Sequence, residues 1–244
     1  MNRYDVLGVK VNIVNIDVAT SLFFNNMDLA RNSYVCCANV HTVVYANEKK
    51  HYKEILNNSF MTLPDGGPIA NEGKKNNNTV KKVSGVDFME SILQLSIDYN
   101  HYFYGESKQV IEYFISNIKE KYHNINICGF KESSFKDLSE NEYKKIKEDI
   151  VQSKADIVWV ALGAPRQEEF CAYLCKNTNA CFVAVGGAFK VISNIIPRAP
   201  KWMQDHSLEW FYRFLKEPKR LFKRYFMAII KYYYYQIKRV LRNA

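Results

Sequence analysis

The stretch Asp156-Ile-Val-Trp-Val-Ala-Leu162 is apolar from its second residue onward, and it is followed by the turn Gly163-Ala-Pro165 and a helical pattern from Arg166. A strand that is apolar on both faces is typical of a parallel sheet buried between two layers of helices. Pro165 suits the first turn of a helix, where its missing N–H costs nothing. The stretch therefore predicts a buried strand that leads directly into a helix.

The same unit, a short apolar run followed by a longer helical pattern, recurs along the 244-residue chain. Strands are expected at 34–38, 60–63, 101–104, 126–130, 156–162 and 181–185. Helices are expected at 18–31, 42–57, 86–99, 107–121, 140–153 and 166–177, and a hairpin at 5–17. This alternation predicts an α/β fold, in which a Rossmann-like, mostly parallel sheet carries helices on both faces.

Glycine marks one recurrent position in this unit. Six of the ten glycines follow predicted strands directly: Gly66, Gly67, Gly105, Gly163, Gly186 and Gly187. In open α/β sheets, ligands bind at the carboxyl ends of the strands, where the backbone must approach them closely. A turn alone can require any one of these glycines, but their shared position predicts a ligand site along that edge.

Two polar residues stand at the same edge. Asp65 follows the predicted strand 60–63, and Asn39 follows 34–38. A carboxylate placed there can act as a general base when a hydroxyl group comes within hydrogen-bonding distance. The position also suits a residue that caps the following helix, and the pattern does not separate these two roles.

The helix after Gly163 opens with Gln167 and Glu168, which are candidates for contacts with sugar or ribose hydroxyls. Free N–H groups at such a helix start favour an anionic ligand such as a diphosphate. The alternative is an ordinary helix start whose acidic residues complement the helix dipole.

The chain lacks the sequence motifs that mark several classes of nucleotide-binding protein. No G-x-G-x-x-G follows the first strand, no G-x-x-x-x-G-K-[ST] occurs and no D-x-D is present. A dinucleotide dehydrogenase and a P-loop NTPase are therefore disfavoured, and no metal or other cofactor is expected. Cys171, Cys175 and Cys181 lack the spacing and histidine partner of a zinc site, so core packing is expected for them. The first 18 residues lack the apolar core of a signal peptide, and no run is long enough for a membrane span, so a cytoplasmic location is expected.

The net charge of +9 is confined to the C-terminal fifth. Residues 196–244 hold 12 basic and 3 acidic residues and 12 of the 35 aromatic residues, whereas the first 195 residues carry 22 charges of each sign. The shift predicts two parts, an α/β body over 1–195 and a basic, aromatic helical appendage over 196–244.

Residues 218–241 are expected to form one long amphipathic helix. At 100° per residue, an apolar face falls within about 120°, and a basic group falls within about 40° on the far side. The apolar face comprises Phe222, Tyr225, Phe226, Ile229, Tyr233, Ile237 and Val240. Three interpretations follow: the helix lies in an anionic membrane surface, its apolar face packs on the body, or it binds nucleic acid.

Taken together, these segments resemble the WecG/TagA/CpsF glycosyltransferase family over nearly the whole chain. The motifs are Leu63-Pro-Asp-Gly66, Ser84-Gly-Val-Asp87, Gly163-Ala-Pro-Arg-Gln-Glu168, Val185-Gly-Gly-Ala-Phe189, Arg198-Ala-Pro-Lys-Trp202, Leu208-Glu-Trp-Phe-Tyr-Arg213 and Glu217-Pro-Lys-Arg220. The resemblance implies an inverting, metal-independent transfer of a hexose-type sugar, N-acetylmannosamine or a related one, from a UDP-sugar. The acceptor would be a polyprenyl-diphosphate-linked sugar at the cytoplasmic membrane face, in the synthesis of a bacterial teichoic acid, capsule or exopolysaccharide.

The resemblance also assigns roles to residues. It implies that Asp65 is the general base and that the appendage docks on the membrane as a peripheral element and completes the active site. The candidates for substrate contacts are Asn39, Gly66, Gly85, Asp87, Gly105, Gly163, Gln167, Glu168, Gly186 and Gly187. The candidates for binding acceptor or donor diphosphate are Arg198, Arg213, Arg220 and Arg224, because guanidinium groups suit phosphate oxygens. A homo-oligomer is also suggested, whereas a nucleic-acid partner is not.

The chain departs from the family pattern at several positions: Cys37 in place of Thr, Lys82 in place of Arg, Lys190 in place of Asp, and 132–135 in place of a Gly-Tyr-Phe element. The changes at Cys37 and Lys190 leave the donor sugar open. They also motivate an alternative function, a non-catalytic nucleotide-sugar-binding or membrane-scaffold protein.

Overall fold

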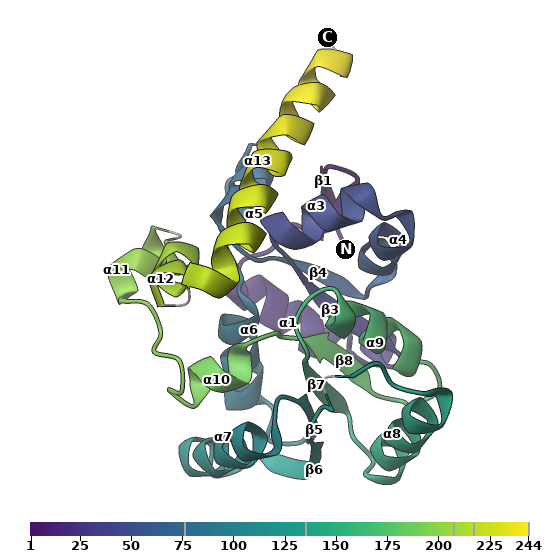
Figure 1. Ribbon diagram of the computed structural model, residues 1–244. Helices are drawn as coiled ribbons and strands as arrows, with labels where there is room; N and C mark the ends of the chain where they lie inside the picture. Colours follow the sequence, from purple (N-terminus) through teal and green to yellow (C-terminus); the bar gives the residue numbers. More distant parts are fainter. Residues whose placement is uncertain (76, 135, 207, 217, 244) are drawn as a thin grey trace.

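The fold is built on one six-stranded parallel sheet with the strand order β4-β3-β8-β7-β5-β6 (Figure 1). The computed structural model describes residues 1–75, 77–134, 136–206, 208–216 and 218–243, and at positions 205, 213, 219–225 and 243 it describes the backbone alone. The strands are β3 (Ser33–Ala38), β4 (Met61–Pro64), β5 (Asn100–Gly105), β6 (Asn126–Lys131), β7 (Ile157–Ala161) and β8 (Cys181–Ala184). All six predicted strands are confirmed.

The register aligns large apolar side chains across the sheet. Trp159 in β7 is paired with Phe103 in β5 and Val183 in β8, and all three side chains are fully buried on one face. Val158 and Val160 point to the other face and are equally buried. Burial of both faces explains why every residue of this strand is apolar.

Helices cover both faces of the sheet, as expected (Figure 1). One face is covered by α1 (Ile16–Asn25), α6 (Gly85–Leu95), α7 (Lys108–Lys121) and α10 (Ala188–Ile192). The other is covered by α3 (Val40–Glu48), α4 (Lys50–Asn58), α8 (Glu140–Gln152) and α9 (Arg166–Leu174). The predicted hairpin is β1 (Arg3–Val6) paired with β2 (Val9–Asn12), and α5 (Gly67–Lys74) follows β4.

Two of the expected helices are each divided in the structure. The segment predicted at 18–31 forms α1 and α2 (Met27–Ala30), separated by Asn26, whose side-chain amide donates to the Leu22 carbonyl at 2.9 Å. The segment predicted at 42–57 forms α3 and α4, separated by Lys49 in an extended conformation. Apolar residues continue with helical spacing across both breaks, so periodicity alone does not reveal them.

The cysteines are part of the core. Cys171, Cys175 and Cys181 are at most 2% exposed, and their thiols are free. Burial raises the pKa of each thiol. Core packing, the role expected for them, is confirmed.

The appendage consists of α11 (Lys201–Asp205), α12 (Glu209–Lys216) and α13 (Pro218–Asn243), so the long terminal helix is confirmed. Helix α13 packs against α3, and its residues Ala228 and Tyr232 are buried, at 6% and 3% exposure. Lys231 forms an ion pair with Glu48 at 2.8 Å. The C-terminal turns of α13 project beyond the body (Figure 1). Across the part of the chain that the structure describes, no helix has the length and apolar character needed to span a membrane.

His101 in β5 makes stability dependent on pH. It is fully buried, its Nδ1 accepts from Trp159 Nε1 at 3.0 Å, and its Nε2 lies 2.8 Å from Ser96 Oγ. Burial lowers the pKa of His101 to about 4. The unfolded chain binds this proton near pH 6.5, so stability should fall as pH drops from about 6.5 to 4, by up to about 3 kcal/mol.

Urea unfolding of the wild type and the His101→Gln variant, at about pH 7 and about pH 4.5, measures this effect. The variant should lose less stability between the two pH values than the wild type, because other acid-sensitive groups are common to both proteins. Equal losses would show that His101 is not the source of the pH dependence.

Candidate active site at the carboxyl edge of the sheet

The structure brings the predicted residues of the body to one edge of the sheet. β4, β3, β8, β7 and β5 are neighbours in this order, so the residues that follow them stand side by side. Asp65 and Gly66 follow β4, Asn39 follows β3, Gly186 and Gly187 follow β8, Gly163 follows β7, and Gly105 is the last residue of β5. This arrangement places a carboxylate at one side of a row of glycine turns.

Asp65 is partly exposed and is held against the end of β3. Its backbone N–H donates to the Ala38 carbonyl at 2.8 Å, and the Asn39 side-chain amide donates to Asp65 Oδ2 at 3.3 Å. Asn39 Oδ1 accepts from the Thr42 N–H, which keeps its amide nitrogen directed at the carboxylate. The N-cap position of helix α5 is occupied by Gly66 and not by Asp65.

The glycines at this edge meet different physical requirements. A Cβ at Gly105 would lie 2.4 Å from the Ala161 carbonyl oxygen, so packing against β7 excludes a larger residue. A Cβ at Gly85 would lie 3.1 Å from the Val185 carbonyl oxygen. The lack of a side chain at Gly85 therefore allows the start of α6 to pack closely against the residue that follows β8. Gly187 has a φ of −76° and no atom within 4 Å of a Cβ. Its lack of a side chain therefore leaves open space above the edge, where a ligand can approach the backbone.

Gln167 and Glu168 have different surroundings from those expected of two sugar contacts. Glu168 is fully buried, and it accepts from Tyr52 Oη at 3.0 Å and from Gln167 Nε2 at 2.8 Å. Gln167 Oε1 accepts from the Gly163 N–H at 3.0 Å. The expected sugar contact of Glu168 does not fit a side chain at 0% exposure. Glu168 instead orients the Gln167 amide, which in turn holds the Gly163 turn.

Asp87 and Arg198, two further candidates for ligand contacts, form an ion pair with each other. Asp87 also accepts from Ser84 Oγ at 2.6 Å, and Arg198 contacts Glu90 at 2.9 Å. Burial by itself would raise the pKa of Asp87, but the Ser84 hydrogen bond and the Arg198 charge lower it below its ordinary value. Arg198 is therefore engaged with carboxylates of the body and does not form an open diphosphate site.

The other three arginines predicted to bind diphosphate lie outside the described side chains. The backbone places Arg213 in α12, and Arg220 and Arg224 in α13. Their roles stay predictions from the sequence.

Sequence reasoning missed an ion pair at the end of β5. Lys190 in α10 contacts Glu106 at 2.6 Å, and Glu106 is 6% exposed. Glu106 directly follows Gly105, so the rule that selected residues after strands would also have found it. Lys190, identified only as a departure from the family pattern, thus has a partner in this chain.

A parallel sheet covered on both faces, with a carboxylate, an amide and glycine turns along its carboxyl edge, defines a Rossmann-like α/β protein with a ligand site at that edge. Within that class the chain belongs to the glycosyl transferase WecG/TagA/CpsF family, whose model matches residues 4–244. The chain is therefore a glycosyltransferase, as the motifs predicted.

Three similar proteins share the name N-acetylglucosaminyldiphosphoundecaprenol N-acetyl-beta-D-mannosaminyltransferase. The protein of that name from Bacillus subtilis (strain 168) is 33% identical over 191 residues, which cover 77% of this chain and 72% of the relative. That from Bacillus spizizenii is 30% identical over 210 residues, covering 84% and 79%. That from Staphylococcus aureus (strain MW2) is 26% identical over 251 residues, covering 99% and 96%.

Proposed function

We propose that this glycosyltransferase moves a hexose-type sugar, N-acetylmannosamine or a related one, from a UDP-sugar to a polyprenyl-diphosphate-linked sugar. The observation that carries the proposal is the partly exposed Asp65 carboxylate, oriented by Asn39 beside a row of glycine turns. The names of the relatives supply the acceptor class. The product would be an intermediate of a bacterial cell-surface polysaccharide, made at the cytoplasmic face of the membrane.

The proposed reaction is a single displacement. The acceptor hydroxyl oxygen attacks the anomeric carbon while Asp65 takes its proton, and the bond between that carbon and the diphosphate oxygen breaks with its electron pair going to UDP. One displacement inverts the anomeric configuration. Arginines of the appendage, rather than a metal, would stabilise the charge on the leaving diphosphate.

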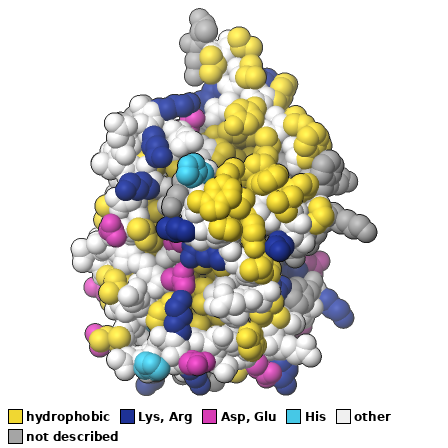
Figure 2. Space-filling view, turned by 90° about the vertical axis from the view of Figure 1, so that its left-hand side faces the viewer, with side chains coloured by type: hydrophobic (Ala, Val, Ile, Leu, Met, Phe, Trp, Pro, Cys, Tyr) yellow, Lys and Arg dark blue, Asp and Glu magenta, His cyan; other side chains and the backbone are white. Residues whose placement is uncertain are grey.

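The exposed side of the appendage supports a place at the membrane surface. Figure 2 shows hydrophobic side chains gathered on the side of the molecule to which α11, α12 and α13 contribute. Trp202, Leu215 and Ile230 are 59%, 57% and 49% exposed. Such a surface beside basic residues suits binding to anionic lipid, which is where a polyprenyl-linked acceptor resides.

A donor screen tests the proposed function. The full chain is incubated without added metal, with a set of UDP-sugars and a short polyprenyl-diphosphate-linked N-acetylglucosamine, and release of UDP is measured. Release that requires both donor and acceptor is the expected result. Binding of a UDP-sugar without turnover on any acceptor would instead favour the non-catalytic binding or scaffold protein.

A further inference from the structure

A cluster of charged side chains around Arg198 connects the start of the appendage to the body. We name Lys82, Asp87 and Glu90 of the body and Arg198 and Glu209 of the appendage the clasp. Lys82 forms an ion pair with Glu209 and also donates to the Gln204 carbonyl at 3.2 Å.

Arg198 lies between the carboxylates of both parts. It pairs with Asp87, its Nη1 lies 2.9 Å from Glu90 and its Nε lies 3.8 Å from Glu209. Every charge that the appendage brings to the clasp therefore contacts a charge of the body.

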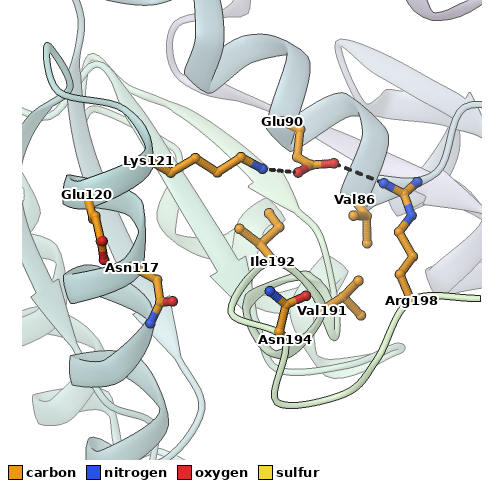
Figure 3. Close-up of a pocket in the computed structure, with 9 residues that line it drawn as sticks. All are labelled: Val86, Glu90, Asn117, Glu120, Lys121, Val191, Ile192, Asn194 and Arg198. Carbon is orange, nitrogen blue, oxygen red and sulfur yellow. Dashed lines mark hydrogen bonds and ion pairs between the residues drawn. The ribbon is translucent and has the colours of Figure 1, made fainter.

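The clasp is partly shielded from water. Its side chains are 16% to 29% exposed, so salt and water screen these pairs less than they screen pairs on an open surface. Arg198 and Glu90 line a groove of about 330 Å³. Figure 3 shows Glu90 between Arg198 and Lys121 of α7, and Lys121 contacts the other carboxylate oxygen of Glu90 at 2.6 Å. Lys121 touches the clasp but contacts no charge of the appendage among those described, which makes it a matched control.

Residues next to Lys82 and Asp87 contact the carboxyl edge of the sheet, which holds Asp65 and is called the catalytic edge below. The N–H of Val83, the residue after Lys82, donates to the carbonyl of Pro64 at 2.9 Å, and Pro64 precedes Asp65. Gly85, two residues before Asp87, packs against Val185 at the end of β8. Lys82 and Asp87 are thus one and two residues away from backbone contacts with the edge of the sheet that holds Asp65.

We propose that the clasp positions the appendage against the catalytic edge, so that an acceptor held at the membrane surface reaches Asp65. Its members are positioning residues and do not contact the substrates. This inference depends on the proposed function, because it assigns the clasp a role in transfer to a lipid-linked acceptor.

A double-mutant cycle on Lys82→Met and Glu209→Gln tests the proposal. Each single variant is expected to lower kcat with the lipid-linked acceptor about 10-fold to 100-fold, and the double variant should be no worse than either, because each removes the same contact. Lys82→Arg, which keeps the charge, should retain most of the activity. Lys121→Met should leave kcat unchanged.

Two further measurements separate positioning from substrate contact and from misfolding. Amide hydrogen exchange over 198–216 should become faster in both single variants, while the affinity for UDP and the melting temperature of the body stay close to those of the wild type. A loss of UDP affinity would overturn the proposal, since it would make these residues donor contacts. So would faster exchange with an unchanged kcat, or effects that add in the double variant.

The two proposals can fail separately. If the wild type transfers no sugar to any acceptor, the proposed function fails, and the role of the clasp in transfer fails with it. If the wild type is active but the clasp variants are equally active, only the clasp proposal fails.

Discussion

Replacing Asp65 by asparagine should lower kcat about 10²-fold to 10⁴-fold, the range that a positioned general base contributes. Asparagine has nearly the same shape, and its side-chain oxygen can still accept the hydrogen bond that Asn39 donates at 3.3 Å. The substitution removes only the group that takes the proton from the acceptor hydroxyl. The turnover number is measured as UDP release at saturating donor and acceptor.

The affinity for UDP should change little in the same variant, because Asp65 acts on the acceptor side of the reacting bond. Asp98→Asn, which neutralises an exposed carboxylate just beyond α6, is the matched control and should retain full activity. An Asp65→Asn enzyme within about threefold of the wild type would show that another group serves as the base.

Much of the body could be predicted because its elements depend on local sequence. The nearly unbroken apolar run at 156–162 is typical of a strand buried on both faces, and the structure confirms β7 at Ile157–Ala161. Parallel strands must end at a common edge, so the positions of Asn39, Asp65 and the strand-end glycines followed from the order of the elements. The helix breaks at Asn26 and Lys49 could not be predicted from the sequence, because apolar residues continue with helical spacing past them.

The roles of charged residues depended on partners far away in the sequence. Glu168 follows Gln167 directly, yet its surroundings are set by Tyr52, which lies 116 positions earlier. Arg198 and Asp87 are 111 positions apart, and Lys82 and Glu209 are 127 apart. A single sequence contains no signal for such pairs, so Arg198, which pairs with carboxylates of this chain, was assigned to a diphosphate.

The sequence predicted the position of the terminal helix but left three possible roles for it. In the structure, the two sides of α13 differ in their burial. Ala228 and Tyr232 are buried against the body, whereas Tyr233, Ile237 and Val240 on the predicted apolar face are 56%, 61% and 65% exposed. The interpretation in which that face packs on the body is therefore wrong for these three residues. On the basic side, Lys231 is paired with Glu48. Arg239, eight residues further along α13, is paired with Asp5, so the body already neutralises part of the charge of the helix.

The double variant Ile237→Glu with Val240→Glu should reduce binding to vesicles of phosphatidylglycerol and phosphatidylcholine by about 30-fold or more. Each apolar side chain contributes about 1 kcal/mol or more on entering the lipid interface, and the two added carboxylates are repelled by anionic lipid. Neither side chain packs against the core, so the unfolding transition should be unchanged. Vesicle sedimentation measures binding, and transfer to a lipid-linked acceptor should fall in parallel, while UDP affinity is maintained.

Leu95→Glu, at the end of α6, is the matched control, because Leu95 is 60% exposed but lies outside the appendage. It should bind vesicles like the wild type. Unchanged vesicle binding in the α13 variant would remove the membrane role of this face. A shift of that variant from an oligomer to a monomer, with vesicle binding intact, would assign the face to a contact between copies of the chain. The predicted result is loss of vesicle binding with an unchanged oligomeric state. A membrane-bound acceptor requires this outcome, because α13 has to contact the lipid while it packs on α3.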